Sequence, residues 1–199
     1  AKDAHAGEVE IFEDPSAKGG AFANMYEGTD TSYGKITNGK LHAVIDSGSV
    51  ITFYHEDGRV LLKEHFRRLR DEESMPLNIM GREYSNGVGD NFRIVARFVA
   101  RKGEKIFGMG QYQQHELDLK GCMAQRNSQV SVPFYLSSIG YGFLWNNPGV
   151  GQVMFANNGT EWVTESGKEI DYLVIAGDTP AEIEENYMTL TGKPPMMPE

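Results

Sequence analysis

The sequence has one cysteine, few positive charges and no long apolar run, and each shortage excludes a class of protein. A single thiol, Cys122, forms no internal disulfide and cannot make up a thiolate zinc site. The net charge of −9 at pH 7 disfavours a nucleic-acid groove and an anionic membrane surface. No stretch reaches the roughly 18 apolar residues of a membrane span. We therefore expect a globular protein that binds neither nucleic acid nor membrane.

Known catalytic and cofactor motifs are also missing. The sequence contains no G-x-S-x-G, no H-E-x-x-H and no Walker loop, and its five histidines lie without ligand spacing. Gly108-Met109-Gly110 lacks the third glycine and the helix of a dinucleotide site, so we interpret it as a bend in a strand. The neighbours His115, Glu116 and Asp118 fit a solvated loop better than a metal or acid/base site. We predict no metal and no cofactor.

The residues that are present favour an all-β protein. Twenty-three glycines separate short apolar stretches, and residues 41–62 read as three strands joined by two turns, one of them at Asp57-Gly58. Tyr141, Phe143 and Trp145 alternate along one strand. Such a stripe is more often sandwich core than a sugar-stacking platform. The prediction is an antiparallel β-sandwich.

One helix is predicted, near the C-terminus. Thr179 is placed to cap it, Pro180 occupies the first helical position, and Glu182 completes a capping box. Apolar residues follow at helical spacing from Ile183, and Gly192 is expected to end the helix.

Composition divides the chain into three parts. Residues 1–35 are polar and glycine-rich, and we expect them to be partly mobile. Residues 36–192 form the predicted β-sandwich domain. Residues 193–199, "KPPMMPE", form neither a good helix nor a good strand and are typical of a linker toward another folded unit.

Four stretches together resemble the N-terminal domain of glycoside hydrolase family 31, which includes α-glucosidases and α-xylosidases. They are "FGMGQ", "LDLKG", "VPFYLSSIGYGFLWNNPG" and "IDYLVIAGDTPAEIEENYMTLTGKPPMMP", and they span Glu104 to Pro198. Where the family has Glu after "GLG" or "GMG", this chain has Gln111. The resemblance implies a galactose-mutarotase-like supersandwich, followed by a (β/α)₈ barrel that carries both catalytic aspartates. It also implies that this chain stops before that barrel and holds no catalytic residue.

The resemblance further implies a role for the loop between the "GMGQ" and "PFY" strands, which lines the sugar pocket in the family. This loop has no Asp between Gly121 and Pro133, so Gln125, Arg126 and Asn127 are the candidate substrate-binding residues. The expected partners are α-linked xylosides or glucosides, the barrel of the same chain, and a second copy if the parent enzyme forms a homo-oligomer. The localisation stays open.

Two other functions compete with this one. An autonomous carbohydrate-binding module would need an exposed aromatic platform, with Trp145 or Trp162 facing solvent. A structural or oligomerisation domain would need no sugar contact at all, and the sequence does not separate it from a domain that braces the barrel.

Overall fold

The computed structural model describes residues 8–11, 32–46, 48–68, 78–111, 116–121, 130–193 and 195. Fifteen strands and one helix lie in these ranges, and every strand pair is antiparallel. None of the helical structure in this part of the chain is both long and apolar enough to cross a bilayer.

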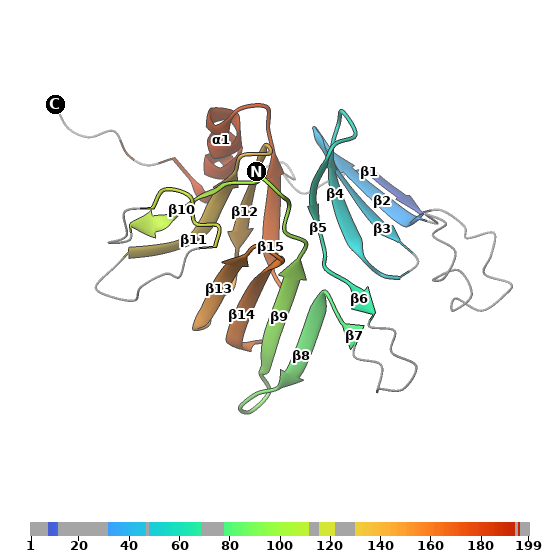
Figure 1. The fold of residues 1–199 in the computed structure, drawn as a ribbon, viewed down its shortest axis with the longest axis vertical. Coiled ribbons are helices and arrows are strands. Elements are labelled where there is room, and N and C mark those ends of the chain that lie inside the picture. The colour runs from blue at the N-terminus through green and yellow to red at the C-terminus, as the bar shows by residue number, and fades with distance from the viewer. Residues whose placement is uncertain are drawn as a thin grey trace, which may run out of the picture.

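The strands form three main sheets and one small ribbon (Figure 1). The first sheet contains, in spatial order, β1 (Glu8–Ile11), β2 (Ser32–Asn38), β3 (Leu41–Asp46), β4 (Ile51–His55) and β5 (Val60–Lys63). The second contains β10 (Ile106–Gln111), β11 (Val130–Ser137), β12 (Tyr141–Trp145) and β15 (Tyr172–Ala176). The third contains β13 (Gly151–Ala156), β14 (Gly159–Gly167), β9 (Phe92–Phe98) and β8 (Arg82–Asn86). The ribbon pairs β6 (Arg67–Arg68) with β7 (Asn78–Ile79).

The second and third sheets pack face to face through aromatic side chains. Phe143 of β12 stacks on Trp162 of β14 with ring centroids 5.4 Å apart, and it meets Phe98 of β9 edge-on at 5.3 Å. The first sheet joins the same core where Phe53 of β4 contacts Tyr172 of β15 at 6.1 Å. The predicted all-β sandwich with one helix is confirmed for the described residues.

The meander of β3, β4 and β5 follows from its turn chemistry. Gly58 has φ +85°, a conformation that L side chains rarely adopt, so the predicted turn at Asp57-Gly58 is confirmed. Past β5 the chain leaves this sheet and pairs with the third one. His65 N–H donates to the Arg97 carbonyl at 2.8 Å, and Val99 N–H donates to the Lys63 carbonyl at 2.9 Å. These bonds fix the first sheet against β9.

The polar N-terminal part of the chain supplies strands to the first sheet. β1 pairs with β2 along its whole length, and β2 begins at Ser32. The first sheet therefore extends on both sides of the predicted boundary between residues 35 and 36.

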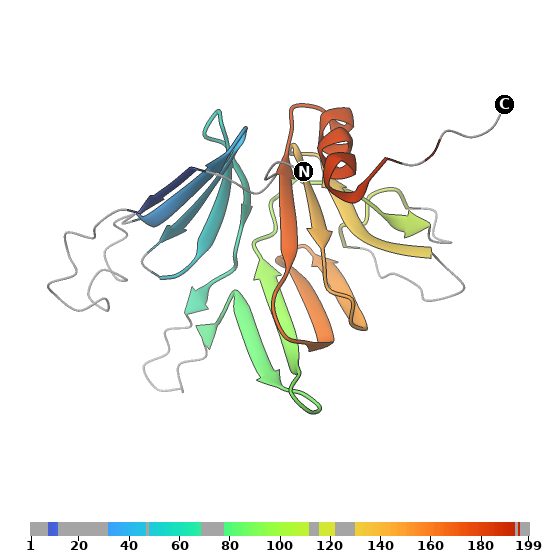
Figure 2. The same ribbon diagram turned by 180° about the vertical axis from the view of Figure 1, so that it is seen from behind.

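The predicted helix is α1 (Pro180–Thr191), which packs on the second sheet beside β12 and β15 (Figure 2). Thr179 Oγ1 accepts from the Glu182 N–H at 3.2 Å, as a capping residue should. Ile183 is 1% exposed and fits above Gly142 and Gly177, where an added Cβ would lie 2.6 and 2.7 Å from its side chain. Only glycine at those two positions lets the helix sit this close. Gly192 has φ +95° and ends the helix.

Candidate functional site

The loop that carries Gln125, Arg126 and Asn127 lies outside the described residues, whereas the segments next to its two ends lie within them. These are β10, residues 116–121 and the start of β11. β10 and β11 are paired up to Gln111 and Val130, which are the last described residues at this end of the two strands.

β10 carries an unusual backbone at its outer half. Gly108, Met109 and Gly110 all have positive φ, at +115°, +67° and +101°, and the register with β11 shifts between Gly108 and Gly110. A Cβ on Gly110 would lie 2.2 Å from the Val130 carbonyl oxygen, so only glycine fits there. Met109 adopts its strained φ while its side chain is buried in the core. The predicted bend is therefore a β-bulge, which redirects the end of β10.

Residues 116–121 are attached to the sandwich by hydrogen bonds. Asp118 Oδ1 accepts from the Ile106 N–H at 3.0 Å and from the Lys120 N–H at 3.1 Å. Leu119 N–H donates to the Ile106 carbonyl at 2.8 Å, and Gly121 N–H donates to the Phe155 carbonyl at 2.7 Å. Glu116 is exposed, as expected for a solvated loop, and His115 lies outside the described residues. The Asp118 carboxylate is instead half-buried and closes a turn against β10. The chain thus enters residues 122–129 from a fixed point.

A buried carboxylate, Glu104, holds this anchoring segment to the second sheet. Its Oε1 accepts from the Ser137 hydroxyl at 2.6 Å and from the Tyr141 hydroxyl at 2.9 Å, and its Oε2 pairs with Lys120 Nζ at 3.1 Å. Burial raises the pKa of Tyr141 well above its usual value, so the hydroxyl stays a neutral donor. Lys120 Nζ also donates to the Arg101 carbonyl at 2.7 Å. The Glu104 network, defined as Glu104, Lys120, Ser137 and Tyr141, pairs its charges internally and holds residues 116–121 to the second sheet.

Sequence reasoning missed the Glu104 network. Its members stand 16, 33 and 37 residues from Glu104, and no local motif connects them. The sequence shows only a Glu two residues before a strand, and a Glu in such a place is solvent-exposed in most proteins.

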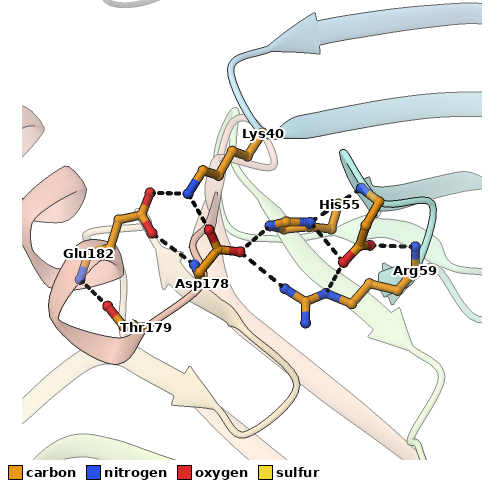
Figure 3. A network of polar contacts seen from close by, with 7 residues as sticks. Lys40, His55, Arg59, Asp178, Thr179 and Glu182 are labelled. Carbon is orange, nitrogen blue, oxygen red and sulfur yellow. Dashed lines mark hydrogen bonds and ion pairs between the residues drawn. The ribbon is translucent and has the colours of Figure 1, made fainter.

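A second polar cluster lies where the first sheet meets the start of α1 (Figure 3). Lys40 Nζ contacts Asp178 Oδ2 at 2.5 Å and Glu182 Oε1 at 2.7 Å, and His55 Nε2 lies 3.2 Å from Asp178 Oδ1. Hydrogen bonds from Lys40 lower the pKa of Asp178 and of Glu182, and their carboxylates raise the pKa of Lys40. This Lys40 network, defined as Lys40, His55, Asp178 and Glu182, connects the first sheet to the start of α1.

Part of the Lys40 network has a metal-like arrangement. One ligand atom each from His55, Glu56 and Asp178 lies within 4.8 Å of the others. Both Asp178 oxygens, however, already face Lys40, His55 or Arg59. A divalent ion would have to displace Lys40 and Arg59 from these oxygens, so the arrangement is explained by ion pairing.

The aromatic stripe is part of the core. Tyr141, Phe143 and Trp145 are 2%, 0% and 4% exposed, as predicted, and Trp162 is 3% exposed. Trp145 Nε1 donates to Thr164 Oγ1 at 2.9 Å inside the sandwich. Neither tryptophan faces solvent, so neither forms the platform that an autonomous sugar-binding module would need.

Comparison with known proteins finds α-glycosidases, among them family 31 enzymes. No protein-family model matches the chain. A family 31 glucosidase of Pseudescherichia vulneris, described as uncharacterized, is 43% identical over 178 residues, which are 82% of this chain and 34% of the relative. An α-xylosidase of Saccharolobus solfataricus is 33% identical over 54% of this chain and 16% of its own length.

A solved structure agrees with these matches. The crystal structure of a family 31 α-xylosidase from a soil metagenome, complexed with xylose, is 41% identical and has a TM-score of 0.81. The alignment covers 100% of this chain and 28% of that protein. This chain therefore spans about a third of the length of the Pseudescherichia vulneris relative and of the soil-metagenome α-xylosidase.

Proposed function

We propose that this chain, which is homologous to family 31 glycoside hydrolases, is a non-catalytic N-terminal domain of a retaining, exo-acting α-glycosidase. In this proposal the domain braces the catalytic barrel, and its 122–129 loop completes the sugar pocket. The observation that carries the proposal is the match to a family 31 α-xylosidase. The match covers the whole of this chain but only 28% of the α-xylosidase.

The hydrogen bonds at the two ends of the loop support the second part of the proposal. A sugar-binding loop must hold its polar groups in place before the ligand arrives, because ordering the loop on binding would weaken affinity. Here the chain enters the loop at Gly121, which is bonded to Phe155, and leaves it at Val130, which is paired with Gln111. The Glu104 network fixes Lys120, the residue before Gly121. Both ends of the loop are therefore held by the rigid sandwich.

The proposed substrates are α-linked xylosides or glucosides, acted on by the barrel. Relatives named as α-xylosidases favour the xyloside. A retaining glycosidase needs two carboxyl groups about 5 Å apart, and the proposal assigns both to the barrel. The fragment by itself is expected to be inactive, and assembly of the parent enzyme into a homo-oligomer remains part of the proposal.

Kinetics of the enzyme that joins this domain to its barrel test the role of the loop. Changing Gln125, Arg126 or Asn127 to Ala should lower kcat/KM about two-fold to a hundred-fold, mainly through KM, because each change removes a hydrogen bond to a sugar hydroxyl. Gln152→Ala on β13, an exposed position, is the matched control and should leave kcat/KM unchanged. If all three loop variants match the wild type on α-xylosides and α-glucosides, the loop does not line the pocket and the domain is only a brace.

A further inference from the structure

A strip of apolar side chains lies on the surface of β11 and of the last turns of α1. Val130 and Val132 of β11 are 65% and 40% exposed, and Leu190 of α1 is 38% exposed. The two groups are joined where Phe134 of β11 stacks on Tyr187 of α1 with ring centroids 4.2 Å apart, and both rings are half-buried. These five residues are called the β11 surface below. They lie outside the sandwich core, and apolar patches exposed in this way mark interaction sites.

The first half of β11 projects beyond the neighbouring strand β12 (Figure 1). β12 pairs with β11 only from Phe134 onward, whereas the pairing with β10 extends to Val130. Among the described residues, no strand pairs with residues 130–133 on the side opposite β10, and all four are exposed. A two-stranded ribbon is only marginally stable in water by itself. This part of the sheet is therefore suited to being covered by a partner.

The β11 surface differs from other exposed apolar positions in its lack of charge. β11 and residues 187–192 contain no charged residue, although 24% of the whole chain is charged. Elsewhere an exposed apolar side chain stands beside a charge: Tyr84 follows Glu83 along β8, and Met154 of β13 faces Glu161 of β14. Depletion of charge together with aromatic residues distinguishes the core of a protein interface from the rest of a surface. The β11 surface has this composition.

The two ends of the strip select the partner. Val130 directly follows the 122–129 loop, which the proposed function places at the sugar pocket of the barrel. Leu190 lies two residues before Gly192, where α1 ends and the predicted linker toward the barrel begins. A body that meets the loop at one end and the linker at the other covers the strip between them. We propose that the β11 surface is where the catalytic barrel of the same enzyme packs against this domain. The inference rests on the proposed function, because it requires a barrel after the linker.

Amide hydrogen exchange tests the surface in the enzyme that joins this domain to its barrel. Compared with the 199-residue chain, residues 130–136 and 187–191 should exchange at least about tenfold more slowly in the enzyme, because the barrel stabilises them against local opening. Residues 80–92, which also carry exposed apolar side chains, are the matched control and should exchange equally in both proteins. Protection of residues 80–92 in place of β11 would overturn this surface and leave the bracing role intact. No protection anywhere in the domain would overturn both.

Leu190→Lys distinguishes an interface residue from one that only stabilises the domain. In the 199-residue chain the urea midpoint should match the wild type, whereas in the enzyme residues 130–136 and 187–191 should lose their protection, because a lysine is unfavourable in an apolar interface. Val132→Lys should act in the same way, and it keeps the test decisive if Leu190→Lys lowers the midpoint. Met154→Lys, at a position 56% exposed on β13, is the control and should change neither measurement.

Two results would contradict the assignment. One is wild-type protection of residues 130–136 in both lysine variants of the enzyme. The other is a dimer of the 199-residue chain, seen by sedimentation and abolished by Leu190→Lys, together with an unprotected β11 in the enzyme. That second result would assign the β11 surface to another copy of this chain.

Discussion

The Glu104 network and the Lys40 network use the same chemistry, a carboxylate paired with a lysine, in opposite surroundings. The side chains of Glu104 and Lys120 are 5% and 10% exposed, whereas those of Lys40 and Asp178 are 32% and 54% exposed. A buried charge pair leaves an uncompensated charge in the protein interior when one partner is lost, but water replaces a lost partner at the surface. We therefore expect the first network to control stability and the second to adjust it only slightly, although the second joins residues 138 positions apart.

The largest effect is expected from Glu104→Ala. The change leaves the Lys120 ammonium and the Tyr141 and Ser137 hydroxyls without their shared acceptor, so the free energy of unfolding should fall by about 3–5 kcal/mol. Urea unfolding followed by circular dichroism measures it. Glu165→Ala removes an exposed carboxylate and should cost less than about 0.5 kcal/mol. Equal losses in the two variants would remove the contrast between buried and exposed pairs.

A smaller effect is expected from Tyr141→Phe, which measures the contribution of one hydrogen bond in the Glu104 network. The variant keeps the ring in the core but removes one of the two hydroxyl donors to Glu104 Oε1. The free energy of unfolding should fall by about 1–3 kcal/mol, since the carboxylate is charged and buried. Tyr187→Phe, which keeps the stack on Phe134, serves as the control and should change it by less than about 0.5 kcal/mol. If Tyr141→Phe left the free energy of unfolding unchanged, Ser137 and Lys120 alone would satisfy Glu104.

The smallest effect is expected from Lys40→Met, and it should depend on pH. Lys40 lowers the pKa of Asp178 and of Glu182, so their contribution to stability is present above the unfolded-state pKa and is lost as the pH falls through the lower folded-state pKa. The raised pKa of Lys40 keeps the lysine charged throughout that window. The difference in melting temperature between wild type and variant should thus be greatest near pH 7 and shrink below about pH 4.

Salt provides an independent check on the Lys40 network. About 1 M NaCl should reduce the difference between the wild type and Lys40→Met, because the Debye length falls to about 3 Å. Lys63→Met changes an exposed lysine on the same sheet and should show no comparable pH dependence. A difference that persists at pH 3 and in high salt would mean that packing of the Lys40 stem, and not its charge, joins the sheet to α1.

Local chemistry made some elements predictable from the sequence. Thr179, Pro180 and Glu182 specify the start of α1 because capping depends on residues three positions apart. The Asp57-Gly58 turn and the alternation of Tyr141, Phe143 and Trp145 depend on neighbours that are equally close along the chain. The Glu182 side chain departs from the standard capping box, since its Oε2 accepts from the Asp178 N–H at 2.9 Å while Oε1 faces Lys40.

The sites depended on contacts that the sequence does not show. Asp118 was predicted in a solvated loop, and it instead accepts a backbone hydrogen bond from Ile106, twelve residues away, because the chain folds back on β10. The candidate residues Gln125, Arg126 and Asn127 stay a prediction, since the described residues fix only the two ends of their loop. Glu64 and Arg82 gave no signal in the sequence, because an ion pair across eighteen residues follows no periodicity.

The sequence by itself determined the secondary structure type, the helix boundaries and the resemblance to family 31, because these follow from side-chain patterns within a few residues. Only the tertiary structure decided which carboxylates are buried and with which partners. Burial depends on how three sheets pack together. A Glu side chain accepts buried hydrogen bonds at Glu104, is buried beside Arg82 at Glu64 and forms an ion pair nearer the surface at Glu182. The physical difference is desolvation, which acts on an atom according to its neighbours in space and not along the chain.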